Sequence, residues 1–251
     1  MMFSGTFYAV EMKRQLRNPF ALVFTLGMPI AMYLLFGAGA EYGSAPMGKG
    51  NVAFYVMVSM AAFGTAVAMT SVCSFAASEV RQGWGRQIAV TPMPMLGYAA
   101  VKLATALTFS IIVVVVVGIV GWSTGARADD AWRWALAALI ILTGGVIFGV
   151  FGLGVGLTFN ADSASSLASI AVTFFAFFGN VFMPLEGTML SIAQFTPMYG
   201  YVSLVRWPIT EGTLLAGGSD NIWLVLGNIA IWAILFAALC LLGIQRSRRR
   251  R

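Results

Sequence analysis

Histidine is absent from the 251-residue sequence, and cysteine occurs only at Cys73 and Cys240. Without histidine the chain can form no histidine-ligated metal site and no Ser-His catalytic triad, and two cysteines cannot complete a zinc site. Charged residues are also scarce, at 10% of the chain, whereas soluble domains carry about a quarter. The sequence therefore predicts no metal site and no catalytic cluster, and it argues against a soluble domain.

Hydrophobic residues, in contrast, make up 59% of the chain, and the mean hydropathy is +0.87. A helix needs about 20 mostly apolar residues to cross about 30 Å of hydrocarbon. We therefore expect an all-α membrane protein, with one transmembrane domain over residues 1–251 and six transmembrane helices. The predicted spans cover about residues 19–38, 52–77, 100–123, 133–158, 164–184 and 221–244.

A seventh uncharged stretch, residues 187–205, is too polar and too often broken by proline and glycine for a lipid-facing helix. Irregular backbone at membrane depth persists only where protein buries it or a cavity wets it. We therefore expect residues 184–216 to form external re-entrant helices between spans five and six.

The basic residues are distributed asymmetrically around these six spans. With both termini in the cytoplasm, eleven of the fifteen lie on the inside, and Lys49, Arg127, Arg133 and Arg206 lie outside. Loops rich in lysine and arginine stay cytoplasmic. We therefore predict a multi-pass protein of the inner (cytoplasmic) membrane with both termini inside. The net charge of +6 reflects this anchoring rather than nucleic-acid binding. The inside residues are Lys13, Arg14, Arg17, Arg81, Arg86, Lys102, Arg246 and 248–251.

The interiors of the six spans lack ionisable residues. Ion-coupled carriers generally need such groups within the membrane, so active transport would take its energy from another subunit. Lys102 lies near a helix end, and we expect its amine to reach the membrane surface.

Residues 3–18 alternate apolar side chains with Glu11, Lys13, Arg14 and Arg17 ahead of Asn18-Pro19. This pattern is typical of an amphipathic interfacial helix, which either anchors the chain or contacts a partner.

Residues 79–94 form the predicted cytoplasmic loop between spans two and three. It mixes charges with exposed apolar residues, and its prolines stop any helix. A short segment of this kind suits the docking of a soluble partner, although a solvated turn would look similar. The candidate contacts are Glu79, Arg81, Gly83, Trp84, Arg86, Thr91 and Pro92.

Four glycines of the predicted fourth span, Gly145, Gly149, Gly152 and Gly156, fall on one helix face. Such a face permits close helix packing, either within the chain or between two copies.

The predicted external segment concentrates proline, glycine and aromatic residues. Glu186 and Arg206 bracket it and could pair at its rim. The segment would act as a gate or as a structural cap. The candidate gate residues are Pro184, Glu186, Pro197, Tyr201 and Arg206.

Together these features resemble the membrane subunit of ATP-binding-cassette type-2 exporters over nearly the whole chain. The resemblance rests on four features: the interfacial helix before Asn18-Pro19, the loop from Glu79 through Gly83 to Thr91-Pro92, the Phe182–Glu186 turn and the Thr196–Tyr201 segment.

The resemblance implies that this chain is a non-catalytic permease subunit with no cofactor of its own. Two ABC ATPase subunits, which hold ATP and magnesium, would bind beneath a pair formed with a second permease copy or homologue. The Glu79–Pro92 loop would be the coupling helix, the interfacial helix would be a second contact, and residues 184–208 would close the exit.

An uncharged interior rich in methionine and phenylalanine suits hydrophobic or amphipathic cargo, such as a drug, an antibiotic or a lipid-like molecule, although these side chains also suit packing and lipid contact. The residues are Met28, Met32, Met57, Met60, Met69, Phe174, Phe175, Phe177 and Phe178. An ATP-independent carrier or channel and a non-transporting sensor subunit remain as alternatives.

Overall fold

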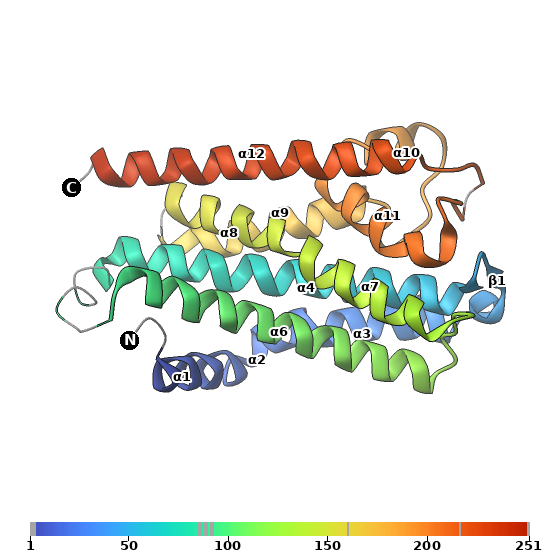
Figure 1. Cartoon of the computed structure of the whole chain (residues 1–251), viewed down its shortest axis with the longest axis horizontal. Helices are drawn as coiled ribbons and strands as arrows, with labels where there is room; N and C mark the ends of the chain where they lie inside the picture. The colour runs from blue at the N-terminus through green and yellow to red at the C-terminus, as the bar shows by residue number, and fades with distance from the viewer. Residues whose placement is uncertain are drawn as a thin grey trace.

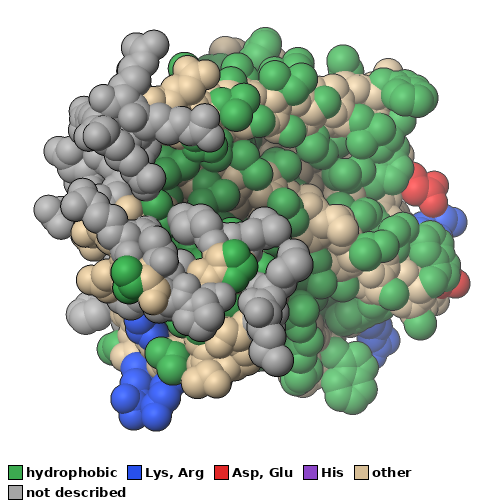
Figure 2. All heavy atoms as spheres, turned by 60° about the vertical axis from the view of Figure 1, so that its left-hand side comes forward, with side chains coloured by type: hydrophobic (Ala, Val, Ile, Leu, Met, Phe, Trp, Pro, Cys, Tyr) green, Lys and Arg blue, Asp and Glu red, His purple; other side chains and the backbone are tan. Residues whose placement is uncertain are grey.

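The computed structural model describes residues 4–84, 87, 90, 93–159, 161–215 and 217–249. Its long helices lie side by side along one axis, with both termini at one end and a short β-hairpin at the other (Figure 1). We call these the terminal end and the hairpin end. Hydrophobic side chains cover most of the side surface in the view of Figure 2, as expected for a protein surrounded by lipid.

The first helical run follows the N-terminal helix α1 (Gly5–Leu16). It is made of α2 (Pro19–Leu22), a π-helical turn η1 (Val23–Gly27), α3 (Met28–Tyr33) and a second π-helical turn η2 (Leu34–Ala38). Pro29 lies in the first turn of α3, where its missing N–H removes one bond of the regular α-helical ladder. Together the run covers the predicted first span.

Helix α4 (Val52–Glu79) is the central helix, and 94% of its apolar stretch is buried inside the protein. The Asn51 side chain caps its first turn by accepting a hydrogen bond from the Phe54 N–H at 3.0 Å. The many alanine and serine residues of α4 allow neighbouring helices to approach closely. Its neighbours include α6 (Met95–Ser123), α8 (Val146–Thr158) and α9 (Ala161–Phe178).

The remaining long helices lie farther out. Helix α7 (Ala131–Gly144) continues into α8 after a break at Gly145, and α12 (Ile222–Arg249) packs over α8 and α11 (Pro197–Thr210). Only 11% of the apolar stretch of α12 is buried, so most of this helix is available to lipid.

Four helical stretches are long and apolar enough to cross a membrane: Val52–Glu79, Gly97–Ser123, Ala131–Thr158 and Ile222–Gln245. The runs Val23–Ala38 and Ala164–Phe178 are apolar but shorter. The all-helical membrane fold is thus confirmed for the described part of the chain, and the count of six spans stays a prediction.

The predicted fifth span, 164–184, extends too far, because α9 ends at Phe178. Asn180 adopts a left-handed conformation with φ of 59°, and its side-chain oxygen accepts a hydrogen bond from the Leu185 N–H at 2.9 Å. These two features turn the chain. The short helices α10 (Gly187–Ala193) and α11 follow at the hairpin end, and their entry into the membrane from outside stays a prediction.

Main-chain hydrogen bonds tie the hairpin end together. A 3₁₀ turn η3 (Glu41–Ser44) leads into the antiparallel strands β1 (Pro46–Met47) and β2 (Gly50–Asn51). The Lys49 N–H donates to the carbonyl of Ile209 at 2.8 Å, and its own carbonyl accepts from Asp129 N–H at 2.9 Å. The hairpin thereby joins the end of α11 to the loop before α7.

Candidate functional site

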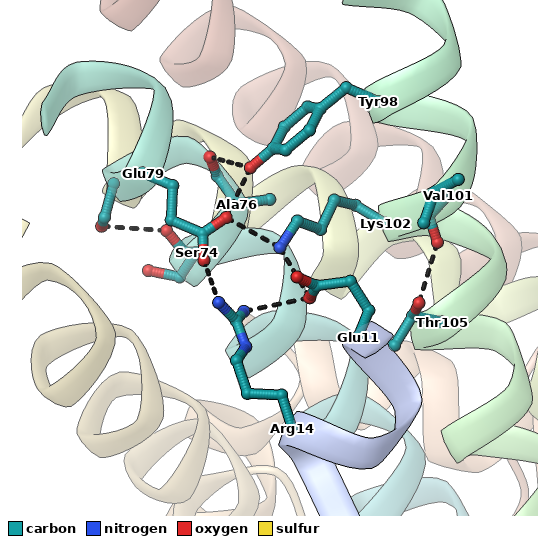
Figure 3. Close-up of polar contacts among 10 residues, drawn as sticks. Glu11, Arg14, Ser74, Ala76, Glu79, Tyr98, Val101, Lys102 and Thr105 are labelled. Atoms are coloured by element: carbon teal, nitrogen blue, oxygen red, sulfur yellow. Dashed lines mark hydrogen bonds and ion pairs between the residues drawn. The ribbon is translucent and has the colours of Figure 1, made fainter. Parts of the chain in front are cut away.

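Five side chains from three separate segments meet at the terminal end, and we call this group the charge cluster (Figure 3). Helix α1 supplies Glu11 and Arg14, the last turn of α4 supplies Glu79, and the first turns of α6 supply Tyr98 and Lys102. The Lys102 amine lies 2.7 Å from a carboxylate oxygen of Glu11 and 2.7 Å from one of Glu79. Lys102 therefore bridges α1 and α4.

Arg14 and Tyr98 complete this arrangement. The Arg14 guanidinium pairs with Glu79 and lies 3.0 Å from Glu11. The Tyr98 hydroxyl donates to Glu79 at 2.6 Å, and the Tyr98 ring stacks on Phe7 of α1. Two carboxylates thus face two cations, so the cluster is formally neutral. Such mutual pairing is what makes buried charges tolerable.

The expectation that Lys102 reaches the membrane surface is wrong, because only 3% of this residue is exposed. Its partners hold the amine inward, and the rings of Phe7 and Tyr98 lie within 5.7 Å and 5.3 Å of it. Glu11 is also buried, whereas Lys13 and Arg17 are exposed on the other face of α1. The predicted interfacial helix is therefore fixed to the helical bundle through one face.

The predicted docking loop begins directly beside the charge cluster. After Glu79 the chain forms a π-helical turn, η4 (Val80–Trp84), which contains Gly83 with φ of 104°. Glycine adopts this conformation without the steric cost that other residues meet. Arg81 and Trp84 belong to the same turn. Arg86, Thr91 and Pro92 lie outside the described residues.

A groove of about 420 Å³ lies between the first helical run, α4 and α9, and we call it the side groove. Its lining combines hydroxyl groups with phenylalanine rings, and its α9 side carries Ser166 and Phe174 at the exposed edge. A pocket of this size with a few polar groups suits a small amphipathic molecule. The polar lining residues are Asn18, Thr25, Ser71, Ser165, Ser166, Ser169 and Thr173.

Sequence reasoning missed the hydroxyl groups of α9, although Ser166, Ser169 and Thr173 stand at the spacing of one helix face. Of the methionine and phenylalanine residues proposed to meet cargo, Phe174 lines the side groove. Met57, Met60 and Met69 are instead buried in the core.

The candidate gate residues lie at the hairpin end, in two environments. Pro184 and Glu186 are exposed, whereas Pro197, Tyr201 and Arg206 of α11 are buried. The Tyr201 hydroxyl donates to the carbonyl of Ile141 at 2.7 Å, which fastens α11 to α7.

The expected pair between Glu186 and Arg206 does not form. The Arg206 guanidinium points inward, donating to the Ser59 hydroxyl at 2.8 Å and to the Val181 carbonyl at 3.2 Å. It also lies 4.0 Å from the centre of the Tyr55 ring. Glu186 stands on the exposed turn before α10, where solvent can hydrate its carboxylate.

The four glycines of α8 and its junction face α4. A methyl group on Gly152 would come within 2.3 Å of the Thr70 carbonyl oxygen, and one on Gly156 within 2.6 Å of that of Ser74. Gly145 and Gly149 approach Thr65 and Cys73 in the same way. The glycine face is thus occupied by packing within the chain.

Comparison with known proteins agrees with this architecture. The sequence matches the family described as ABC-2 type transporter over residues 4–210. It is 28% identical over 208 residues to the Bacillus subtilis (strain 168) protein named "Putative transport permease YvfS", a match that covers 80% of this chain and 83% of that protein. Because the family match spans most of the helical bundle, including the charge cluster and the side groove, this chain belongs to the ABC-2 type transporter family.

Proposed function

We propose that the chain is the permease subunit of an ATP-driven exporter of the cytoplasmic membrane. Two copies, or this chain and a homologue, would pair in the membrane, and two ABC ATPase subunits holding ATP and magnesium would bind at the terminal end. The charge cluster is the observation that carries the proposal, because it joins α1, α4 and α6 beside the loop where an ATPase would dock.

The charge cluster would transmit movement of the docking loop to the helices of the bundle. A displacement of the Glu79–Pro92 loop acts first on the last turn of α4, and α4 is the helix on which α6, α8 and α9 pack. Lys102 and Arg14 link the same turn to α1. An ATPase that moves the loop would therefore move the interfacial helix and the central helix together.

The side groove supplies the proposed cargo path. It lies between helices that this motion would shift, and its serine and threonine hydroxyls face phenylalanine rings. Such a lining can hydrogen-bond the polar part of a molecule and pack against its apolar part. A second permease copy would cover the exposed edge of the groove. The proposed cargo is accordingly a hydrophobic or amphipathic molecule.

The test is recovery of an ATPase with the full-length chain from its native host in mild detergent. The variant Trp84→Ala/Arg86→Ala changes the docking loop, and the control Trp122→Ala/Arg127→Ala changes the same residue types at the hairpin end. We expect the wild type and the control to retain a soluble ATPase and the loop variant to lose it.

Recovery of the wild-type chain without any ATPase would overturn the proposal in favour of a stand-alone carrier or sensor. Equal recovery with the loop variant would reject this loop as the docking contact. Purified complex in vesicles then provides the second readout, namely ATP-dependent movement of a fluorescent amphiphile out of the compartment that holds the ATPase.

A further inference from the structure

A second groove, of about 360 Å³, runs along α12 at the hairpin end, and we call it the α12 groove. One wall is α12 itself, and the other is the link between α10 and α11 together with the start of α11. The second wall belongs to the segment 184–208 that would close the exit, whereas the α12 wall has no part in the proposed export cycle.

Hydrogen bonds between the two walls fix the shape of the groove. The Asn228 side-chain amide donates to the carbonyls of Gln194 at 2.8 Å and Thr196 at 3.2 Å. Farther along α12, the Trp232 indole N–H donates to the carbonyl of Phe195 at 2.9 Å. The groove is therefore a built feature of the fold rather than a chance gap between loosely packed helices.

The length of the groove matches one leaflet of a bilayer. Its lining extends along α12 from Trp223, next to Asp220 at the helix start, to Trp232. The ten residue steps from Ile222 to Trp232 rise by about 15 Å at 1.5 Å per residue, and half of a 30 Å hydrocarbon core is also about 15 Å. The apolar stretch of α12 continues to Gln245, so the groove covers the half nearest α11.

The two ends of the groove differ in chemistry. Asp220 lies at the mouth, and among the described lining residues it is the one with a carboxylate. The Tyr199 hydroxyl donates a hydrogen bond to this carboxylate at 2.6 Å. In the described part of the chain no cation lies within 4.0 Å of this carboxylate. Trp223, which follows Asp220 by three residues along the chain and is 76% exposed, lies at the same end of the lining. A carboxylate beside an open aromatic ring attracts an ammonium group.

The deeper part of the groove is apolar. Leu224 and Ile231 line it, and both are more than half exposed. These side chains suit contact with an acyl chain, and tryptophan at the mouth is the residue that favours the boundary between lipid and water.

From this arrangement we infer that the α12 groove binds a membrane lipid whose head group carries an ammonium, such as phosphatidylethanolamine. The ammonium lies against Asp220 and the exposed Trp223 ring, and an acyl chain follows Leu224 and Ile231 toward Trp232. The lipid belongs to the leaflet on the α11 side, which the distribution of basic residues predicts to be the outer one. This inference does not depend on whether the chain exports anything.

The experiment is native mass spectrometry of the purified full-length chain, titrated with phosphatidylethanolamine and, separately, with phosphatidylglycerol of the same acyl composition. We expect the wild type to bind the ammonium lipid about fivefold more tightly. Asp220→Asn keeps the shape of the side chain and removes its charge, so the preference falls to about one. The matched control is Asp129→Asn. Asp129 is exposed at the same end of the protein but does not line the groove, so this variant keeps the wild-type preference.

Trp223→Ala provides a second variant if Asp220→Asn does not fold, because an exposed side chain contributes little to the fold. We expect it to weaken phosphatidylethanolamine binding about threefold, with an unchanged circular dichroism spectrum. A wild type without preference for the ammonium lipid, or a preference that survives both variants, would overturn the inference. A wild type that binds dodecyltrimethylammonium but not phosphatidylethanolamine would also overturn it, and would assign the groove to a cationic amphiphile instead.

Discussion

Lys102 and Arg206 are buried cations at opposite ends of the same helical bundle, and they are held in different ways. Lys102 lies between two carboxylates, each 2.7 Å from its amine. Arg206 meets a hydroxyl, a carbonyl and an aromatic ring, and within the described residues no carboxylate lies within 4.0 Å of it. The terminal end is therefore joined by paired charges and the hairpin end by neutral acceptors.

This difference affects what each end can do. The paired charges come from α1, α4 and α6, so the terminal end depends on side chains that reach across three segments. The hairpin end is additionally closed by main-chain hydrogen bonds from Lys49 to α11 and to the loop before α7. We expect substitutions of single charges to have larger effects at the terminal end, and substitutions that disturb the backbone to matter more at the hairpin end.

Lys102→Met should produce the largest loss of stability. It leaves the buried carboxylate of Glu11 facing the partly buried carboxylate of Glu79, with the half-exposed Arg14 as their remaining cation. Removing one partner of a buried pair costs about 3–5 kcal/mol. Equilibrium unfolding in mixed micelles, followed by circular dichroism, measures this loss. Lys13→Met, on the exposed face of α1, is the control, and a Lys102→Met protein as stable as this control would refute the pairing.

Arg206→Met should cost less, about 1–3 kcal/mol, because it leaves the Val181 carbonyl and the Ser59 hydroxyl without this donor but breaks no ion pair closer than 4.0 Å among the described residues. Measured in the same micelles, the ratio of the two losses tests the comparison directly. If Arg206→Met lowered the free energy of unfolding more than Lys102→Met does, the conclusion that neutral acceptors hold Arg206 would be wrong.

Gly48→Ala addresses the backbone of the hairpin end. Gly48 has φ of 57°, and a methyl group there would come within 2.1 Å of the Ile209 carbonyl oxygen. The left-handed conformation alone costs about 1–2 kcal/mol for a residue with a side chain. Because the contact with the Ile209 carbonyl adds to this cost, we expect a loss of at least that size, together with faster hydrogen exchange at the Lys49 amide. Gly5→Ala, where a methyl group would meet nothing within 4 Å, is the control and should leave both quantities unchanged.

The fold was largely predictable from sequence because hydropathy acts over long windows. The predicted stretches 52–77 and 221–244 coincide closely with α4 and the apolar part of α12. The end of the fifth span was predicted incorrectly, because no charged residue marks the turn at Asn180. A local conformation with positive φ ended the helix there.

The candidate site was less accessible to sequence reasoning. Glu11, Glu79 and Lys102 are separated by tens of residues, and each alone looks like an ordinary charge near a helix end. Only the packing of α1 against α6 brings them together. Arg206 and Glu186 were expected to pair because they flank one segment, but helix direction turned the guanidinium toward Ser59. The direction of a side chain depends on tertiary packing, and the pattern of charges along the sequence does not predict it.

Arg14→Met should have the smallest effect on stability and thereby sharpen the contrast within the charge cluster. The Arg14 side chain is 46% exposed, and Glu79 keeps Lys102 and Tyr98 as partners when Arg14 is replaced. Exposed ion pairs contribute about 0–1 kcal/mol, so we expect a loss in that range in the same unfolding measurement. Arg17→Met, an exposed arginine one turn away, is the control. A loss for Arg14→Met as large as that for Lys102→Met would mean that the cluster acts as a single unit in which every member is required. A loss close to that of the control would mean that Lys102 alone joins α1 to α4, and that Arg14 is free to respond to a partner at the docking loop.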